Sequence, residues 1–297
     1  TRLADIKREF KHERNSLYKH LIHACVTGDH EVLTPTGWTT LADLQDGTLI
    51  AQWQDDRVEF VVPTHITRDQ FHGELVAIRG RGISANMTPN HRVPVISSYG
   101  TVKEVCADAL TSVGSGRIPV CGVLASGEPQ SDLKLRLAVA VQADATWKHG
   151  QVRFHLVRPR KQQRLTQLLN DLEIPYRVEP CKCHDGGLRF IFQESAASFL
   201  HQWLIKDNKT FRIDAILSSD LDSRRTFLAE LLMWDGHLRR GIGQSAYFST
   251  NGTNAKIVQT IAHVSGQQAL LRIDQQRGLR QPVFRVSFNR RRKVRIE

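Results

Sequence analysis

The sequence lacks long apolar segments, and it is poor in sulfur-containing and aromatic residues. Its 297 residues include five cysteines and two methionines, and aromatic residues make up only 7%. No apolar run approaches the roughly 20 residues that a membrane-spanning helix needs, and residues 1–24 are too charged for a signal peptide. Five cysteines form an odd and sparse set, which excludes a disulfide-stabilised scaffold. These absences predict a protein without membrane contact, located in the cytoplasm.

The positive charge is concentrated in one part of the chain. The formal net charge is +11, but residues 25–130 carry −5 and residues 131–297 carry +13. A module this basic favours a polyanionic partner, most simply nucleic acid, and a basic solubilising surface is the plainer alternative. The length predicts two domains, at roughly 100–200 residues each.

The first 130 residues contain two different patterns. Residues 1–24 carry apolar side chains at helical spacing and predict a helix that packs on something outside this chain. Residues 25–128 alternate short apolar runs with Pro, Gly and Asp-Gly, which predicts a mostly β module. Within it, residues 39–43 can start a helical turn with a hydroxyl cap. Gly, Ser and Pro within 114–131 indicate a linker.

From residue 129 onward, helical and strand patterns alternate and occur twice, with a period near 91 residues. The first copy covers about 133–222 and the second about 223–297. Two copies predict a pseudo-two-fold unit within one chain. The predicted helices are 133–144, 161–172, 228–235 and 254–264, and the predicted strands are 152–157, 175–179, 187–193, 246–250 and 269–273.

Each copy opens with an apolar helix that ends on an acid. LAVAVQADA at 137–145 aligns with LAELLMWDG at 228–236, which places Asp144 and Asp235 at the same position. Small residues on one helix face allow close packing, so the two acids are expected to meet at one end of the helix pair. Because a helix dipole disfavours an acid at the C-terminus, the pair needs a counter-charge, and a hydrated divalent cation suits it.

These two segments resemble the LAGLIDADG motif of homing endonucleases, in its single-chain, two-motif form. The resemblance implies a monomeric αββαββα endonuclease domain, with Asp144 and Asp235 holding Mg²⁺ or Mn²⁺ to hydrolyse double-stranded DNA. The sequence departs from the motif at Gln142, Ala145 and Trp234. Two ordinary buried helices with surface acids are the plainer alternative.

The same resemblance implies a saddle of strands that contacts DNA. The basic residues predicted to neutralise phosphates are Arg153, Arg158, Arg160, Lys161 and the tail Arg290, Arg291, Arg292 and Lys293. The family often places a basic residue before the second motif to support the nuclease centre. Lys209 and Arg212 precede that motif here, and Lys209 is predicted to be catalytic.

Residues 25–128 carry a second resemblance. CVTGDHEVLTPTGW at 25–38 and MTPNHRVPV at 87–95 resemble the first and second splicing blocks of inteins, whose splicing module has the Hint fold. The resemblance makes the fold class α+β, with a mostly-β Hint-type module before the endonuclease domain at 129–297. It also makes residues 1–24 the end of a host protein, an N-extein.

The chemistry of splicing explains the residue types of these blocks. By resemblance, Cys25 attacks the carbonyl of Ala24 and converts an amide to a thioester. His91 then donates the proton that the leaving amide nitrogen needs, and Thr88 polarises or orients the bond. A buried thiol and a turn histidine are the plainer alternatives for Cys25 and His91.

The end of the sequence lacks the His-Asn that closes an intein, since Asn289 is followed by Arg290. A truncated sequence, a C-terminal intein fragment acting in trans, and lost splicing all remain open. Among the other cysteines, Cys106 and Cys121 are expected to be buried, and Cys181 to Asp185 is a weak zinc candidate without a second ligand pair.

The sequence therefore predicts an intein-encoded endonuclease fused to an N-terminal autoprocessing module, in a microbial or phage-infected cell. The first alternative is a DNA-binding intein with an inactive nuclease, and the second is the N-terminal half of a trans-splicing protein. A processing domain whose basic part is purely structural is a further possibility.

Overall fold

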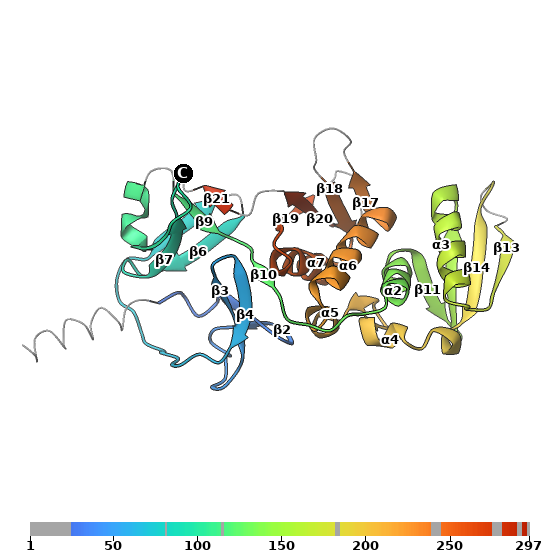
Figure 1. Ribbon diagram of the computed structural model, residues 1–297, viewed down its shortest axis with the longest axis horizontal. Coiled ribbons are helices and arrows are strands. Elements are labelled where there is room, and N and C mark those ends of the chain that lie inside the picture. Colours follow the sequence, from blue (N-terminus) through green and yellow to red (C-terminus); the bar gives the residue numbers. More distant parts are fainter. Residues whose placement is uncertain are drawn as a thin grey trace, which may run out of the picture. The chain divides into compact units, whose positions relative to one another are not determined.

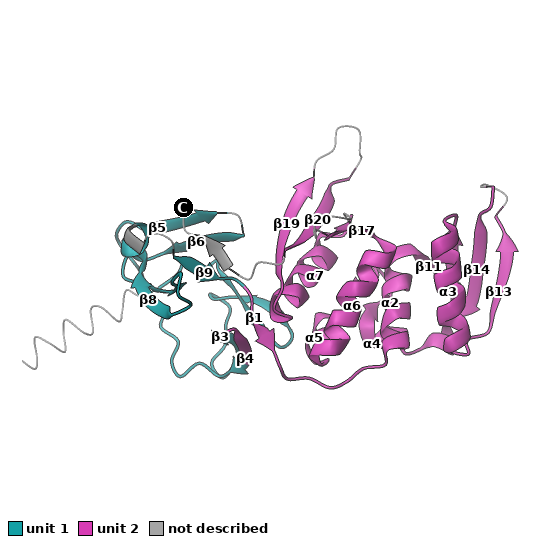
Figure 2. Ribbon diagram, turned by 45° about the horizontal axis from the view of Figure 1, so that its top comes forward, with its two compact units in different colours: residues 1–55, 60–120, 293–297 teal, residues 56–59, 121–292 magenta. Residues whose placement is uncertain are grey.

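The computed structural model describes residues 25–80, 82–113, 116–181, 185–238, 245–274, 281–289 and 293–295. The chain divides into two compact units (Figure 2), with residues 1–55, 60–120 and 293–297 in unit 1 and residues 56–59 and 121–292 in unit 2. Three predictions fall outside the described residues: the helix at 1–24, the basic residues at 290–292 and the zinc candidates at 182–184.

Unit 1 is mostly β, as its short apolar runs predict. Its elements are β1 (Glu31–Thr34), β2 (Gly37–Thr40), β3 (Ile50–Gln54), the end of β4 (Arg57–Val61), β5 (Val76–Gly80), β6 (Ile83–Met87), β7 (Arg92–Ile96), β8 (Val102–Cys106), the 3₁₀ helix η1 (Ala107–Val113), β9 (Arg117–Pro119) and β21 (Lys293–Arg295). Strands β1–β2 and β5–β6 form antiparallel hairpins, and a four-stranded sheet has the order β21-β9-β7-β8. The predicted turn at 39–43 begins at the end of β2, and residues 41–43 form it. The predicted hydroxyl cap is present, because the Asp43 N–H donates to Thr40 Oγ1 at 3.2 Å.

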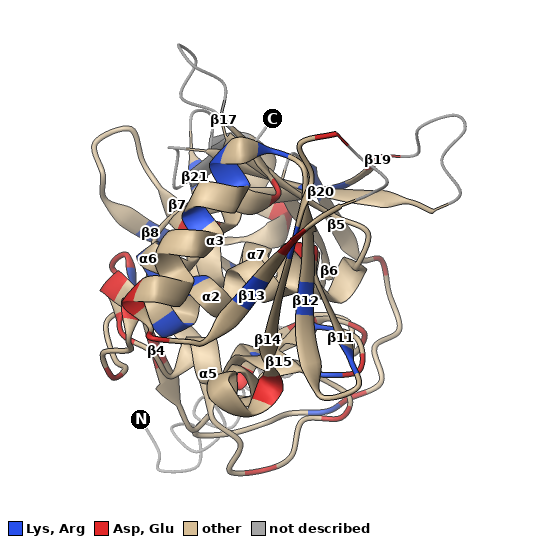
Figure 3. Ribbon diagram, turned by 90° about the vertical axis from the view of Figure 1, so that its right-hand side faces the viewer, with Lys and Arg blue, Asp and Glu red and all other residues tan. Residues whose placement is uncertain are grey.

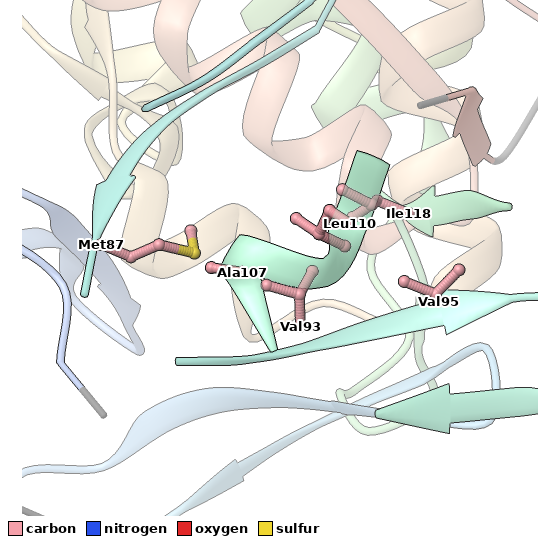
Figure 4. Packing of buried hydrophobic residues seen from close by; sticks show 6 residues of the cluster. All are labelled: Met87, Val93, Val95, Ala107, Leu110 and Ile118. Atoms are coloured by element: carbon pink, nitrogen blue, oxygen red, sulfur yellow. The ribbon is translucent and has the colours of Figure 1, made fainter. Parts of the chain in front are cut away.

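A small apolar core holds unit 1 together. The side chains of Met87, Val93, Val95, Ala107, Leu110 and Ile118 gather around η1 and strands β6, β7 and β9 (Figure 4). Strand β7 follows the alternation expected of a half-buried strand, because Val93 and Val95 point into this core while Arg92 is exposed.

The last strand differs from the predicted domain boundary. Residues 129–297 are predicted to form one domain, but β21 pairs antiparallel with β9, so that Val294 lies opposite Ile118. Strand β9 pairs with β7 along one edge and with β21 along the other. Strand β21 therefore hydrogen-bonds the backbone groups that would otherwise be unpaired on the outer edge of β9. The chain therefore returns to unit 1 after unit 2.

Unit 2 contains two copies of one arrangement of helices and strands. The first copy contains α2 (Asp132–Asp144), β11 (Ala145–Lys148), β12 (Gln151–Leu156), α3 (Pro159–Asp171), β13 (Tyr176–Pro180) and β14 (Leu188–Gln193). The second contains α6 (Leu221–Trp234), β17 (Gly236–Leu238), β18 (Ser245–Ser249), α7 (Gly252–Val264), β19 (Gln268–Asp274) and β20 (Val283–Asn289). Their antiparallel sheets have equivalent orders, β11-β12-β14-β13 and β17-β18-β20-β19.

Short elements connect the two copies and complete unit 2. They are η2 (Glu194–Ala197), α4 (Leu200–Trp203), β15 (Leu204–Ile205), β16 (Thr210–Phe211) and α5 (Ile213–Leu217). Strand β10 (Val123–Leu124) lies within the predicted linker and pairs in parallel with Arg57 and Val58 at the start of β4. In the part of the chain that the structure describes, no helix is long and apolar enough to span a membrane.

Helices α2 and α6 pack side by side at the centre of unit 2, with α3 and the first sheet on one side and α7 and the second sheet on the other (Figures 1 and 2). The central position explains the composition of α2, because Leu137 to Val141 are all fully buried and carry no polar face.

Candidate functional site

The paired helices α2 and α6 bring two carboxylates together at one end. Asp144 is the last residue of α2, and Asp235 caps the end of α6 by donating its backbone N–H to Leu231 O at 3.0 Å. The ammonium of Lys161 lies between the two acids. Its Nζ donates to Asp144 Oδ2 at 2.6 Å and lies 3.6 Å from Asp235 Oδ1. Both carboxylates therefore reach one cation.

The structure places Lys161 differently from the sequence prediction, which grouped it with the phosphate-binding cations of the surface. Lys161 is only 9% exposed, it is the third residue of α3, and its Nζ also lies 5.6 Å from the centre of the Trp234 ring. Two partly buried carboxylates this close together require a cation nearby, and α3 supplies it. The spacing along the sequence carried no sign of this, because Asp144 and Lys161 lie on different elements.

The two carboxylates have unlike surroundings. Burial raises the pKa of Asp235, and the charge of Asp144 raises it further, whereas Lys161 and Lys209 oppose the shift. Asp144 instead has the short ion pair with Lys161. The arrangement thus places two carboxylates and two lysine ammonium groups in a partly dry site, where charges interact strongly.

Lys209, predicted to be catalytic, lies beside the same acids. Its Nζ donates to the backbone carbonyl of Ala145 at 2.8 Å, directly after the first acid. Burial lowers the pKa of Lys209, while Asp144 and Asp235 favour its charged form. Its backbone is left-handed, with φ of 53°, which is unusual for a residue other than glycine. Arg212, the other candidate, pairs with Asp214 instead.

A pocket opens beside Asp235. It has a volume of about 330 Å³, and its lining includes Asp235, Lys209, Gln142, Asn251 and Asn254. This combination of one carboxylate, one ammonium and several amides suits a polar, partly anionic group better than an apolar ligand.

Sequence reasoning missed Asn254, which holds the loop that carries Lys209. Asn254 is fully buried, its Oδ1 accepts from the Phe211 N–H at 2.9 Å, and its Nδ2 donates to Lys209 O at 3.2 Å. Asn251 caps α7 by accepting from the Asn254 N–H at 3.1 Å. The Asn-Gly-Thr-Asn sequence at the start of α7 signals such a cap, but not the contact with Lys209.

The donor set fits one kind of metal ion. In the part of the chain that the structure describes, no group of three or more His, Cys, Asp or Glu can hold a metal. Two carboxylates alone match Mg²⁺, which retains water and is bound by one or two carboxylates together with substrate phosphates. They do not match a closed structural site of the zinc type.

Figure 3 shows Lys and Arg positions in blue on α3, β12 and β13. Four of the predicted DNA-contacting cations, Arg153, Arg158, Arg160 and Lys161, belong to β12 or to the start of α3, whereas Lys293 begins β21 in unit 1. Arg153 extends from the face of β12 opposite to its buried side chains and bonds Gln151 at 2.8 Å. Arg158 is the exposed residue before α3. Arg160 is exposed but donates to Met233 O on α6 at 2.9 Å, so it also joins the two halves.

Three further cations belong to this sheet and were missed by sequence reasoning. Strand pairing places Arg177 opposite Ile191, which itself lies opposite Arg153. The same pairing places Arg189 beside His155, and Lys148 opposite Gln151. The alternation of buried and exposed residues along these strands was the signal that could have identified them.

The structure also brings together Cys25 and Thr88, although 63 residues separate them. The Cys25 N–H donates to Thr88 Oγ1 at 2.9 Å, and the Thr88 N–H donates to Cys25 O, also at 2.9 Å. Thr88 is buried, and its hydroxyl also lies 3.3 Å from Cys25 O. The nitrogen contacted by Thr88 Oγ1 is the nitrogen of the peptide bond between Ala24 and Cys25.

Two histidines belong to this part of unit 1. His91 ends the turn that starts at Thr88, since its N–H donates to Thr88 O at 3.0 Å. His30 was missed by sequence reasoning: its Nδ1 contacts Thr27, and its Nε2 accepts from the Asn86 N–H at 3.2 Å. Burial and the charge of Asp69 raise the pKa of the Cys25 thiol.

The other described cysteines divide into two kinds. Cys121 and Cys181 are buried, but Cys106 is exposed, contrary to the prediction that it fills a core. Cys106 is the last residue of the edge strand β8, where the alternation directs it to solvent.

Comparisons with known proteins give partial matches. No family model matches the chain. A segment of 82 residues is 28% identical to the ATP-dependent Clp protease proteolytic subunit of Chlamydomonas moewusii, and it covers 27% of this chain and 8% of that protein. The chain therefore matches only a small part of the length of that relative.

Among solved structures, the chain is similar over about half its length to the homing endonuclease I-DmoI. The structure of I-DmoI with DNA and Mn has 11% identity and a TM-score of 0.39, and it covers 53% of this chain and 89% of that one. A single-substitution variant of I-DmoI, with its target DNA and Mg, has a TM-score of 0.38 at 11% identity, with the same coverage. The N-terminal LAGLIDADG domain of DUF199/WhiA has 14% identity and a TM-score of 0.35, and it covers 52% of this chain and 74% of that one.

Proposed function

We propose that unit 2 is a divalent-metal-dependent endonuclease of the LAGLIDADG homing type, which cuts both strands of a DNA duplex. The observation that carries this proposal is the meeting of Asp144 and Asp235 at the ends of two closely packed helices. The basic face of the first sheet supports it, because cations along strands neutralise the phosphates of a duplex that lies across them.

The residues of the site have separable roles in this proposal. Asp144 and Asp235 would hold Mg²⁺ or Mn²⁺, with water and DNA phosphates as the remaining ligands. When bound, the ion activates water and stabilises the charge that develops on the phosphate. Lys209 faces the pocket next to Asp235 and orients the phosphate there. The outward cations Arg153 and Arg158 position the duplex.

A cleavage assay tests the proposal. Duplexes are first selected for binding from a random library, and they are then incubated with the chain and Mg²⁺. Wild type is expected to cut both strands, while Asp144→Asn and Asp235→Asn each lower the rate about 100-fold or more, as loss of electrostatic stabilisation does. Asp171→Asn, at the exposed end of α3, is the matched control. Binding without cutting by wild type would instead identify a DNA-binding protein with an inactive nuclease.

A second function is supported by a separate observation in unit 1. We propose that this unit is an intein-type autoprocessing module of the Hint class, because Thr88 Oγ1 lies 2.9 Å from the nitrogen of the bond before Cys25. Cys25 Sγ attacks the Ala24 carbonyl carbon, a C–S bond forms, and the C–N bond breaks. The nitrogen becomes the free amine of Cys25, with His91 as the proposed proton donor.

Thiol-induced cleavage tests this second function. Dithiothreitol is expected to release a fragment that ends at Ala24, and Cys25→Ala abolishes the release. Thr88→Ala slows it, whereas Cys106→Ala, which removes an exposed thiol elsewhere in unit 1, leaves it unchanged. Release that is independent of Cys25 would overturn the assignment. Ligation after adding a C-terminal intein fragment would show splicing in trans.

A further inference from the structure

The ammonium of Lys161 occupies the position between two carboxylates where a cation would bind. It reaches Asp144 at 2.6 Å and Asp235 at 3.6 Å, and only 11% of its side chain is exposed. The two acids keep 24% and 31% of their side-chain exposure, so their outer sides remain accessible from solvent. A cation arriving from solvent can therefore meet the acids, while Lys161 approaches them from the protein side.

Neighbouring contacts hold Lys161 in this place. On the preceding residue, Arg160 donates to Met233 O at 2.9 Å. One turn along α3, Arg164 forms a bidentate pair with Glu230, which is 2% exposed, and Trp234 Nε1 also donates to Glu230 at 2.7 Å. These contacts fix the start of α3 against the end of α6. Lys161 is thus pre-positioned and does not reach the acids by chance as a flexible surface chain would.

The second copy of the repeat shows that the fold does not require a lysine here. Helices α3 and α7 each contain 13 residues and occupy equivalent places, and the third residue is Lys161 in α3 but Asn254 in α7. Asn254 is buried and serves the Lys209 loop, with no charge of its own. The lysine is a feature of one copy only, which points to a role at the acid pair.

We propose that Lys161 is a built-in counter-ion that competes with the divalent cation for Asp144 and Asp235. The inference rests on the proposed nuclease function and concerns the protein before DNA binds. An ammonium between two carboxylates satisfies them without metal, so the protein folds metal-free with a stable acid pair. A divalent ion then has to displace the ammonium, which weakens metal binding relative to a bare pair of acids.

Calorimetric titration with MnCl₂ in the absence of DNA tests the competition. Lys161→Met retains the length of the side chain beside Trp234 but removes its charge, and it is expected to bind Mn²⁺ about tenfold more tightly than wild type. Lys103→Met, which removes an exposed cation from the edge strand β8 of unit 1, is the matched control and keeps wild-type affinity. If wild type binds Mn²⁺ and Lys161→Met binds it equally or more weakly, the inference about Lys161 is wrong, but the proposed metal site stands. Absence of Mn²⁺ binding in both proteins overturns the proposed metal site as well.

A second measurement on the wild-type chain does not depend on the folding of a variant. Amines are acetylated with and without MnCl₂, and the modification of each lysine is followed by mass spectrometry. Lys161 is expected to be protected without metal and several-fold more reactive with it, while Lys148 reacts equally in both conditions. Unchanged protection of Lys161 in protein that has bound Mn²⁺ would show that the ion does not displace the ammonium.

Discussion

At the scale of single residues, the candidate site depends on groups whose position is set by a neighbour. Lys209 has a left-handed backbone. The buried side-chain amide of Asn254 donates to the backbone carbonyl of Lys209 and accepts from the Phe211 N–H. Such a conformation persists only where surrounding contacts determine it. Asn254 is therefore a positioning residue for Lys209, and it does not itself react.

Replacing the side-chain amide of Asn254 should lower the cleavage rate without weakening the binding of the DNA duplex. Asn254→Asp keeps the size of the side chain but replaces the group that donates to Lys209 O with an acceptor. The loop that carries Lys209 should therefore shift, and the cleavage rate should fall about 10- to 100-fold, as it does when other supporting partners of a metal site are replaced. Duplex affinity should stay near that of wild type. Single-turnover cleavage and equilibrium binding measure the two effects, and Asn170→Asp, at an exposed position on α3, serves as control. Unchanged cleavage would remove Asn254 from the site.

The thiol of Cys25 provides a pH prediction. Because burial and Asp69 raise its pKa above the ordinary value, less thiolate is present at neutral pH than for a free cysteine. Dithiothreitol-induced release should therefore increase with pH and continue to increase above the ordinary pKa of a thiol. Asp69→Asn should move this profile to lower pH, whereas Asp46→Asn, at another exposed position of unit 1, should not. Initial rates of fragment release are measured between about pH 6 and 10, a range that includes the ordinary pKa of a cysteine thiol. An unchanged pH profile in Asp69→Asn would contradict the assigned role of Asp69.

At the scale of elements, helix α3 is fixed to α6 by charged side chains at the boundary between the two copies of the repeat. The carboxylate of Glu230 is buried and accepts hydrogen bonds from Arg164 and from Trp234 Nε1. A buried carboxylate needs such partners, because a lost partner leaves its charge desolvated and unpaired. This contact connects the two copies of the repeat at the level of the acid pair.

Arg164→Met should accordingly destabilise unit 2 by about 3 kcal/mol, the usual cost of removing one member of a buried pair. The double variant Arg164→Met, Glu230→Gln should recover part of this loss, because no buried charge remains. Arg225→Met removes an exposed ion pair of α6 with Asp222 and should change the free energy of unfolding by less than about 1 kcal/mol. Urea unfolding measures all three, and equal effects of Arg164 and Arg225 would contradict the argument.

The elements were more predictable from sequence than their charged contacts. Periodicity predicts helices at 133–144 and 254–264 that match α2 and α7 within two residues, because local burial patterns determine them. The pairing of Asp144 with Asp235 followed from two aligned motifs. The burial of Lys161 did not, because a lysine at a helix start looks the same whether it faces solvent or an acid pair contributed by two other helices.

At the scale of the whole molecule, the chain passes from unit 1 into unit 2 and returns through β21. Sequence reasoning did not foresee the return, because three residues beside a run of arginines carry no strand pattern of their own. Strand pairing with β9 is a long-range property that a local pattern does not encode. The division into units thus differs from a simple succession of two domains.

Deleting residues 293–297 should weaken unit 1 alone. Loss of β21 exposes the backbone edge of β9, so amide hydrogen exchange should accelerate in β9 and β7. Amides of α2 in unit 2 should exchange at the wild-type rate and provide an internal control. Equal acceleration in both units, or in neither, would show that β21 does not belong to unit 1 in solution.

The return of β21 also has a consequence for the order of events during synthesis. The residues that pair β9 with β21 are separated in the chain by residues 121–292 of unit 2. Closing so long a loop is slower than forming local contacts, and on the ribosome it must wait until β21 emerges. Helices α2 and α6 and their two acids can therefore assemble before the sheet next to Cys25 and Thr88 is complete.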